Sequence, residues 1–182
     1  ATSVKAFAQK QPHRMMKDWP ESGSKTRIAH MADGDFFASE RSTTIPADTS
    51  VSIEFTANSG EKTTLKEGLD LLAGEVIDAS VMSVSALRAF FAASMAEAKE
   101  KGALLSLHLK ATMMKVSDPV MFGHCVSVYF ADALDKHAAD LAEIGANLDN
   151  GLADVLDKLD RLPADKRAEV EADINACYES GP

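Results

Sequence analysis

The chain has 182 residues, of which 46% are hydrophobic and 26% are charged, and its formal net charge is −9. This size and composition fit a globular protein with one core or two small lobes, and the acidic balance argues against binding nucleic acid through its phosphates. No long apolar run suggests a membrane span, and neither Cys125 nor Cys177 has the neighbouring Cys and His residues of a structural zinc site. We therefore expect a cytoplasmic protein with reduced thiols and with no membrane or nucleic-acid partner.

The first third of the chain is predicted to contain a weak helix and two strands. Ala1–Lys17 has a helical pattern that is broken at Pro12. Thr26–Met31 and Phe36–Ile45 are predicted to be strands, because a turn-forming Ala-Asp-Gly-Asp sequence separates them.

The clearest hairpin follows. Ser50–Ala57 alternates apolar Val51, Ile53 and Phe55 with polar residues, an Asn-Ser-Gly-Glu turn reverses the chain, and Lys62–Lys66 returns as a second strand. Gly68–Ser80 carries two glycines and is predicted to be an irregular connection.

A helix and a strand lie at the centre of the chain. Ser83–Lys101 is predicted to be a helix with Ser83 as its N-cap and Gly102 just beyond its end. Its core face should contain Val84, Leu87, Phe91 and Met95. Leu104–Lys110 follows as a strand, since Leu105, Leu107 and Leu109 alternate with Leu104, Ser106, His108 and Lys110.

The C-terminal part is predicted to be helical. Asp118-Pro119 is a helix start in which the Asp caps the free amides, and this helix should continue to Ile144 and stop at Gly145. Gly151–Leu162 and Ala164–Tyr178 are two further helices. We therefore expect an α+β (mixed α/β) fold, with antiparallel strands and a hairpin in the N-terminal half and C-terminal helices packed on the sheet.

Lys110 is the strongest candidate for a functional residue. It lies at the end of the predicted strand, on its polar face, where a lysine can reach a bound anion while its aliphatic stem stays packed. Periodicity alone does not decide between such a cleft and an ordinary solvated surface.

Other polar residues near Lys110 have structural explanations beside functional ones. Lys115 is a second candidate for contacting substrate, or else a surface or carboxylate-pairing lysine. His108 shares the face of Lys110, but a single histidine is more often a hydrogen-bonded structural residue. We interpret Asp118 as a helix cap before a metal ligand, and Met113-Met114 as core filling.

The remaining motifs do not indicate a cofactor site. Asp33, Asp35, Glu40 and Arg41 form a charged cluster without calcium-loop spacing, and the turn accounts for it. Arg88 lies on the central helix and has a structural interpretation. The sequence contains no GxGxxG, P-loop or nucleophile-elbow pattern. No cofactor-binding residue can be named, and no metal ligand is assigned.

Three uncommon stretches together resemble a known family. SLHLKATMMKVSDP at 106–119, VMSVSALRAFF at 81–91 and HMADGDFFASERS at 30–42 occur in the order found in monomeric NADP-dependent isocitrate dehydrogenases. That family is a single chain several times longer than this one, and the resemblance extends from near Val4 to the C-terminus. The chain thus resembles one internal segment of such an enzyme.

The resemblance implies a role for Lys110. By its position in LHLKAT, Lys110 corresponds to the family's catalytic and substrate-binding lysine. The implied reaction is oxidative decarboxylation of isocitrate to 2-oxoglutarate with NADP and Mg²⁺ or Mn²⁺, as used in the tricarboxylic acid cycle and the glyoxylate bypass. The metal ligands and most substrate contacts are expected outside this segment.

The resemblance also implies how the chain is organised. Residues 1–182 should form a single segment of the large domain, divided into a β-rich part at 26–66, a helix-strand-helix part at 83–144 and a helical part at 151–178. The parent is expected to be monomeric, and the isolated segment should be inactive and prone to self-association through surfaces that the rest of the chain covers. The alternative is a non-catalytic folding or partner-binding module in which Lys110 has no role.

Overall fold

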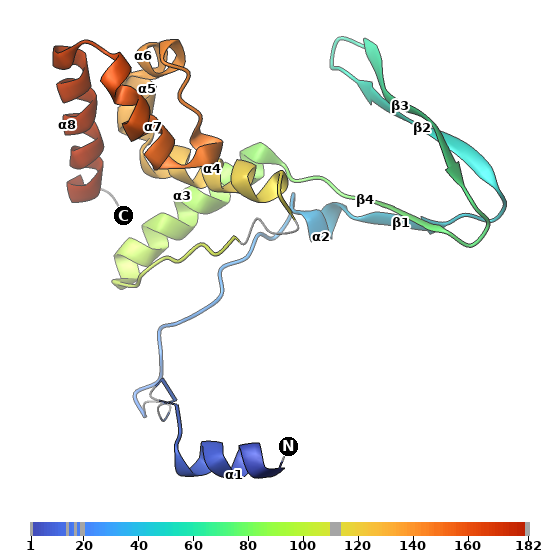
Figure 1. The fold of residues 1–182 in the computed structure, drawn as a ribbon, viewed down its shortest axis with the longest axis horizontal. Coiled ribbons are helices and arrows are strands. Elements are labelled where there is room, and N and C mark those ends of the chain that lie inside the picture. Colours follow the sequence, from blue (N-terminus) through green and yellow to red (C-terminus); the bar gives the residue numbers. More distant parts are fainter. Residues whose placement is uncertain (1, 14, 17, 19–20, 110–113, 181–182) are drawn as a thin grey trace.

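The computed structural model describes residues 2–13, 15–16, 18, 21–109 and 114–180. Helices α3 to α8 form a lobe, and four strands form an arm that projects away from it (Figure 1). The N-terminal helix α1 (Thr2–Lys10) lies apart from both and has no buried residue. The predicted fold class is confirmed: strands occupy the N-terminal half and helices the C-terminal half.

The arm consists of two antiparallel pairs of strands. Its elements are the short helix α2 (Phe36–Ser39), β1 (Arg41–Thr44), β2 (Thr49–Thr56), β3 (Lys62–Leu71) and β4 (Val76–Ala79). β1 pairs with β4 at the base of the arm, and β2 pairs with β3 as the predicted hairpin. The register of the β2–β3 pair is irregular at two places, between Val51 and Ile53 and between Ile53 and Glu54.

Two strand predictions and one prediction of an irregular connection in this region differ from the structure. Thr26–Met31 is irregular, and Ile28 is 89% exposed, so no buried face holds this segment as a strand. Phe36–Ile45 begins as a helix because the Asp35 carboxylate accepts a hydrogen bond from the Ala38 amide at 2.9 Å. Gly68–Ser80 is more regular than expected, since β3 continues into it and β4 finds β1 as a partner.

The lobe contains six α-helices and two short 3₁₀-helices among the described residues. Their bounds are α3 (Val84–Lys101), α4 (Ser117–Tyr129), α5 (Ala131–Lys136), α6 (Ala138–Glu143), η1 (Leu148–Asn150), α7 (Leu152–Lys158), η2 (Leu159–Arg161) and α8 (Ala164–Ser180). Both predicted ends of α3 are confirmed: the Ser83 side chain accepts from the Ala86 amide, and Gly102 adopts a left-handed conformation with φ 59°.

The single helix predicted from Pro119 to Ile144 is three helices. The chain departs from helical geometry at Phe130 and at His137, which separate α4, α5 and α6. Both residues are buried, with 6% and 3% of their surface exposed. A straight helix cannot direct all of its apolar positions into one compact lobe, so these two bends follow from burial. The predicted end at Gly145 is confirmed.

Two clusters of apolar side chains stabilise the lobe. The larger joins α4 to α8 around Val155 and Leu159, both fully buried. The smaller is Leu87, Phe91 and Met95 on α3, as predicted, whereas Val84 is 46% exposed. In the described residues the helices pack on one another and not on the sheets, so that part of the prediction was wrong. No helix in this part of the chain has the length and apolarity needed to span a membrane.

Candidate functional site

The segment 104–109 connects α3 to the region of Lys110, and its alternation is confirmed although it is not a strand. Leu105, Leu107 and Leu109 are half-buried, while Ser106 and His108 are exposed. Leu105 and Leu107 pack against the Leu87, Phe91 and Met95 cluster. The described residues offer this segment no pairing strand, so side-chain packing on α3 fixes its polar side outward.

The polar side of this segment contains a local hydrogen bond. His108 Nε2 lies 2.8 Å from the Ser106 hydroxyl, and both side chains are exposed. This contact orients the imidazole without burying it, which agrees with the structural interpretation of His108.

Lys110 lies outside the described residues, and so does Met113. The assignment of Lys110 as the catalytic lysine therefore stays a prediction. Lys115 is described and is exposed. Met114 is 47% exposed, so its predicted role as core filling was wrong.

Helix α4 begins directly after this region. Val116 is its N-cap, and Ser117 is its first residue, so the prediction that Asp118 is the cap was wrong. Asp118 is instead buried in the first turn, with 4% of its surface exposed. A carboxylate in that turn interacts favourably with the positive end of the helix dipole. Pro119 stays in the first turn, as expected.

A groove of about 610 Å³ runs beside the 104–109 segment. It lies between that segment, the irregular residues 25–29 and the last turns of α3, and its apolar lining includes Phe90, Leu105 and Cys125. Burial raises the pKa of the Cys125 thiol, so at neutral pH this thiol is protonated and a poor nucleophile.

The charged groups at the rim of this groove pair with one another. The Glu97 carboxylate forms ion pairs with Arg27 and Lys101, and Lys25 Nζ donates to the Lys101 carbonyl oxygen at 3.3 Å. A small polycarboxylate bound here would compete with Glu97 for these cations. The groove therefore fits an apolar group better than an anionic metabolite.

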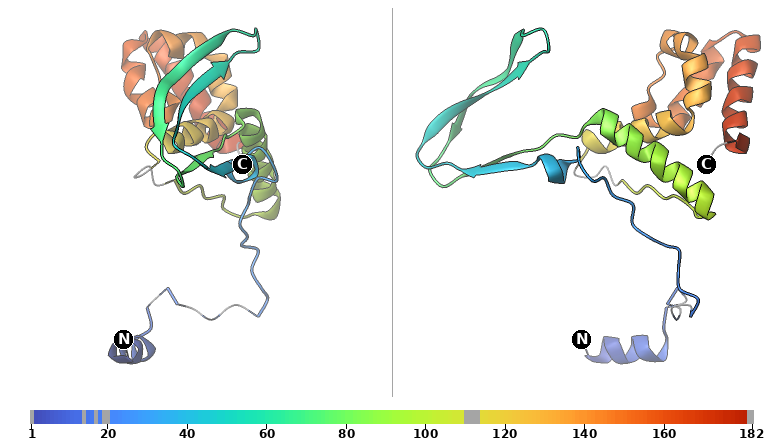
Figure 2. Two further views of the ribbon diagram at one scale, coloured as in Figure 1. Left: turned by 90° about the vertical axis from the view of Figure 1, so that its right-hand side faces the viewer. Right: turned by 180° about the vertical axis from the view of Figure 1, so that it is seen from behind.

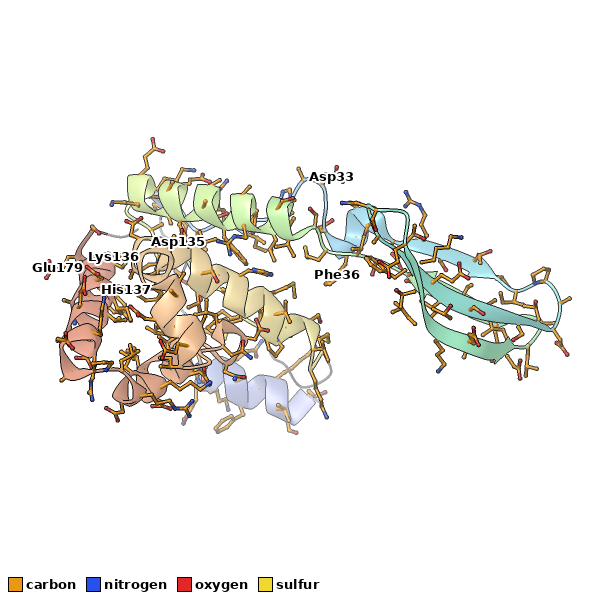
Figure 3. All side chains as sticks on the ribbon, turned by 90° about the horizontal axis from the view of Figure 1, so that it is seen from above. Asp33, Phe36, Asp135, Lys136, His137 and Glu179 are labelled. Carbon is orange, nitrogen blue, oxygen red and sulfur yellow. The ribbon has the colours of Figure 1, made fainter. Side chains whose placement is uncertain are left out.

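The charged cluster predicted near Asp33 serves local structure. The Asp33 carboxylate accepts from the Gly34 amide at 2.8 Å, Asp35 caps α2, and Arg41 donates to the Glu40 carbonyl oxygen. Asp33 and Phe36 lie where the arm joins the helical lobe (Figure 3). The interpretation of this cluster as turn chemistry is confirmed.

Sequence reasoning missed a second polar cluster between α5 and α8. His137 Nε2 lies 2.6 Å from Asp173 Oδ2, and Lys136 Nζ lies 2.7 Å from the same oxygen and 3.2 Å from Glu169 Oε1. Figure 3 places Lys136 and His137 beside the last helix. The partners are more than thirty positions apart in the sequence, with no motif spacing, so only the fold reveals the cluster.

The donor atoms of His137, Glu169 and Asp173 are close enough together to hold a metal ion. The ammonium group of Lys136 already neutralises both carboxylates, and hydrogen bonds from Lys136 are the main cause that lowers the pKa values of Asp173 and Glu169. Lys166 lies 3.6 Å from Glu169 as well. A divalent cation would have to enter against two lysines, so we interpret the cluster as a salt-bridge network and not as a metal centre.

Comparison with known proteins places these features in a family. All 182 residues match the family described as monomeric isocitrate dehydrogenase. The chain is 54% identical to isocitrate dehydrogenase [NADP] 2 of Colwellia maris, 51% to isocitrate dehydrogenase [NADP] of Azotobacter vinelandii and 43% to isocitrate dehydrogenase [NADP] 2 of Mycobacterium tuberculosis, each over 180 residues. Each match covers 99% of this chain but 24% of the relative, so the chain spans about a quarter of the length of these curated relatives.

Proposed function

Because the chain belongs to the monomeric isocitrate dehydrogenase family, we propose that it forms one segment of the large domain of a longer NADP-dependent enzyme. That enzyme oxidises and decarboxylates isocitrate to 2-oxoglutarate. The observation that carries this proposal is the match of the whole chain to a family whose relatives are about four times longer and are named NADP isocitrate dehydrogenases.

Lys110 is the residue of this segment to which we assign chemistry. The reaction removes the proton of the C2 hydroxyl and transfers a hydride from C2 to NADP⁺; loss of CO₂ then leaves an enolate that takes up a proton. An ammonium group beside the C2 oxygen lowers the cost of forming the alkoxide and can exchange a proton with it. Lys110 would bind the substrate and carry out this proton transfer. The fixed polar side of 104–109, packed through Leu105 and Leu107, supports the assignment.

The described residues do not fit the metal that the family implies. Their one group of three potential ligands, at His137, is occupied by the ion pairs of Lys136. We therefore assign the ligands of Mg²⁺ or Mn²⁺ and the NADP contacts to the other three quarters of the chain.

The same proposal covers the setting of the enzyme. We place the longer protein in the cytoplasm as a monomer with isocitrate as its substrate, a setting in which thiols such as Cys125 and Cys177 stay reduced. The isolated 182-residue chain should lack activity, because one lysine cannot hold substrate, metal and hydride donor together. It should also self-associate as its concentration rises, through apolar surface that it leaves exposed.

The test requires a complete enzyme. We would replace the quarter of the Azotobacter vinelandii enzyme that aligns with this chain by residues 1–182 and measure NADPH formation with isocitrate and Mn²⁺. Lys110→Ala should lower the turnover of this chimera by a factor on the order of 10²–10⁴, whereas Lys115→Ala is the matched control and should change it little. Unchanged turnover in Lys110→Ala would reject the catalytic assignment and favour a non-catalytic module.

The isolated chain provides a second test. With isocitrate, NADP⁺ and Mn²⁺ it should form no NADPH while showing a cooperative thermal transition by circular dichroism. Turnover by the isolated chain would mean that these 182 residues build a complete site, against the proposal.

A further inference from the structure

The β2–β3 hairpin has one apolar face, which we call the arm face: Val51, Ile53, Phe55, Leu69 and Leu71. The alternation of β2 puts its three residues on one side, and the register brings Leu69 opposite Val51 and Leu71 opposite Thr49 on that same side. The other side of the hairpin is polar, with the cross-strand pairs Ser50–Asp70, Glu54–Thr64 and Thr56–Lys62.

The outer part of the arm face is uncovered. Phe55 is 56% exposed and Ile53 is 48% exposed, while Val51, Leu69 and Leu71 are half-buried. By contrast, the apolar cluster Leu87, Phe91 and Met95 on α3 is buried. The hairpin extends away from the helical lobe in the right-hand view of Figure 2, whereas the left-hand view looks along the arm toward the lobe. A two-stranded hairpin without a third layer is marginally stable in water, so such a face needs a cover.

We propose that the arm face is a docking surface inside the full-length enzyme, covered by another part of the same longer chain. The relatives are about four times longer than these residues, so three quarters of such a chain is available as the cover. The family is described as monomeric, which favours cover by the same chain over cover by a second copy. The proposal depends on the family assignment and not on the role of Lys110.

The chemistry of the arm face defines its occupant. The five residues of the arm face are apolar, and the register places one charged residue, Lys66, on the same side, opposite Ile53. The 3.8 Å ion pair between Glu54 and Lys62 lies on the opposite, polar side. The occupant is therefore a mainly apolar face of a sheet or helix of the same chain, with a polar group near Lys66, and the polar side of the hairpin stays in contact with water.

Thiol labelling tests this docking in the same chimera. We would introduce Phe55→Cys on the arm face and Glu54→Cys on the polar side, and measure maleimide labelling of each position by peptide mass spectrometry. Both thiols should react at similar rates in the isolated chain. In the chimera, labelling of Phe55→Cys should slow on the order of 100-fold, because the cover must open first, while Glu54→Cys should keep its rate.

Each result decides the proposal. Equal labelling of Phe55→Cys in the chimera and in the isolated chain would overturn it, and Ile53→Cys repeats the measurement if Phe55→Cys disturbs the chimera. Light scattering must give the mass of one chain for the protected species; protection seen only at the mass of two chains would identify a second copy and also overturn it. NADPH formation by the unsubstituted chimera is read separately, so an inactive chimera with a protected arm face would reject the catalytic proposal and support this one.

Discussion

The helical lobe and the arm differ in how far each buries its own apolar residues. In the lobe, Val155 and Leu159 are completely inaccessible to water and Val170 is 1% exposed. In the arm, Phe55 and Ile53 have about half of their surface exposed. The lobe therefore obtains its stability from apolar contacts within these 182 residues. The arm has the amphipathic pattern of an element that packs on a core, but no described residues pack against its most exposed apolar side chains.

Truncating a core residue of the lobe should give the largest effect on stability. Leu159→Ala, at the start of η2, removes buried methyl groups and leaves a cavity in the larger apolar cluster, so we expect the free energy of unfolding to fall by about 2–5 kcal/mol. Urea denaturation of the isolated chain, followed by circular dichroism at 222 nm, measures it. Phe55→Ala in the arm is the contrasting variant and should change that free energy by less than about 1 kcal/mol. Similar losses in the two variants would contradict the difference between lobe and arm.

A close contact between α4 and η1 predicts the next effect. A Cβ atom at Gly123 would lie 2.6 Å from Asp149 Oδ1 and 3.0 Å from the Asp149 backbone nitrogen. Gly→Ala within a helix normally stabilises by roughly 1 kcal/mol, but here the overpacking should dominate, and Gly123→Ala should destabilise the lobe by about 1–3 kcal/mol. The same urea titration measures it.

Two companion variants identify the cause. Adding Asp149→Ala to Gly123→Ala should recover part of the loss, because the nearest clashing atom belongs to that side chain. Glu100→Ala, at an exposed position of α3, controls for alanine in a helix and should have little effect. A stabilised Gly123→Ala variant would show that α4 and η1 are not in tight contact.

The predictions from the sequence were right where local signals determine the structure and wrong where distant contacts determine it. The hairpin and α3 were found because alternation, turn residues and caps are local signals. The bends at Phe130 and His137 were missed, since neither proline nor glycine marks them and their cause is burial against distant helices. The 104–109 segment was predicted only in part. Its alternation correctly indicated which leucines are half-buried, but it is not a strand, because a strand also needs a pairing partner.

The polar groups of the candidate site also include one that a local motif indicates and others that only tertiary packing brings together. Lys110 was selected from a motif and lies outside the described residues, so the structure adds only the orientation of the segment that precedes it. The His137 network could not be predicted, because its members come from α5, from the bend after it and from α8, and are brought together by tertiary packing. The expectation that the metal ligands lie elsewhere in the family chain stays a prediction.

The salt-bridge network of the lobe predicts a pH dependence. The pKa values of Asp173 and Glu169 are lowered from their ordinary values of 3.8 and 4.5, mainly by hydrogen bonds from Lys136. Lowered pKa values mean that these carboxylates stabilise the fold above their ordinary values and that this contribution is lost as the pH falls through the lowered values. The lobe should therefore lose stability as the pH is lowered from about 5 toward 3.

Lys136→Met should reduce that acid-induced loss, because the carboxylates then no longer have the cation that lowers their pKa values. Urea midpoints between pH 3 and pH 7 measure the slope for both proteins. Lys62→Met, which removes an exposed ion pair of the arm, is the matched control and should leave the slope unchanged. An equal slope in Lys136→Met and the unsubstituted chain would show that the network is not coupled to folding.

The smallest expected effect lies at the base of the arm. The pKa of Glu40 is raised above its ordinary value of 4.5 by a hydrogen bond with Asp78 and by the charge of that carboxylate. A raised carboxyl pKa means that the folded chain holds this proton more tightly than the unfolded chain, so ionisation of Glu40 slightly weakens the β1–β4 pair as the pH rises through that pKa.

Asp78→Asn removes the neighbouring charge and should return the pKa of Glu40 toward 4.5, which a carbon-detected NMR titration of the side-chain carboxyl group measures. The effect on overall stability should be close to the detection limit, because both groups are in contact with water. Asp70→Asn, on the polar side of the hairpin, is the control and should leave the Glu40 titration unchanged. If Asp78→Asn also leaves it unchanged, the two carboxyl groups are not adjacent in solution, and the β1–β4 pairing that brings them together would have to be revised. The arm would then depend on the rest of the longer chain for its base as well as for its apolar face.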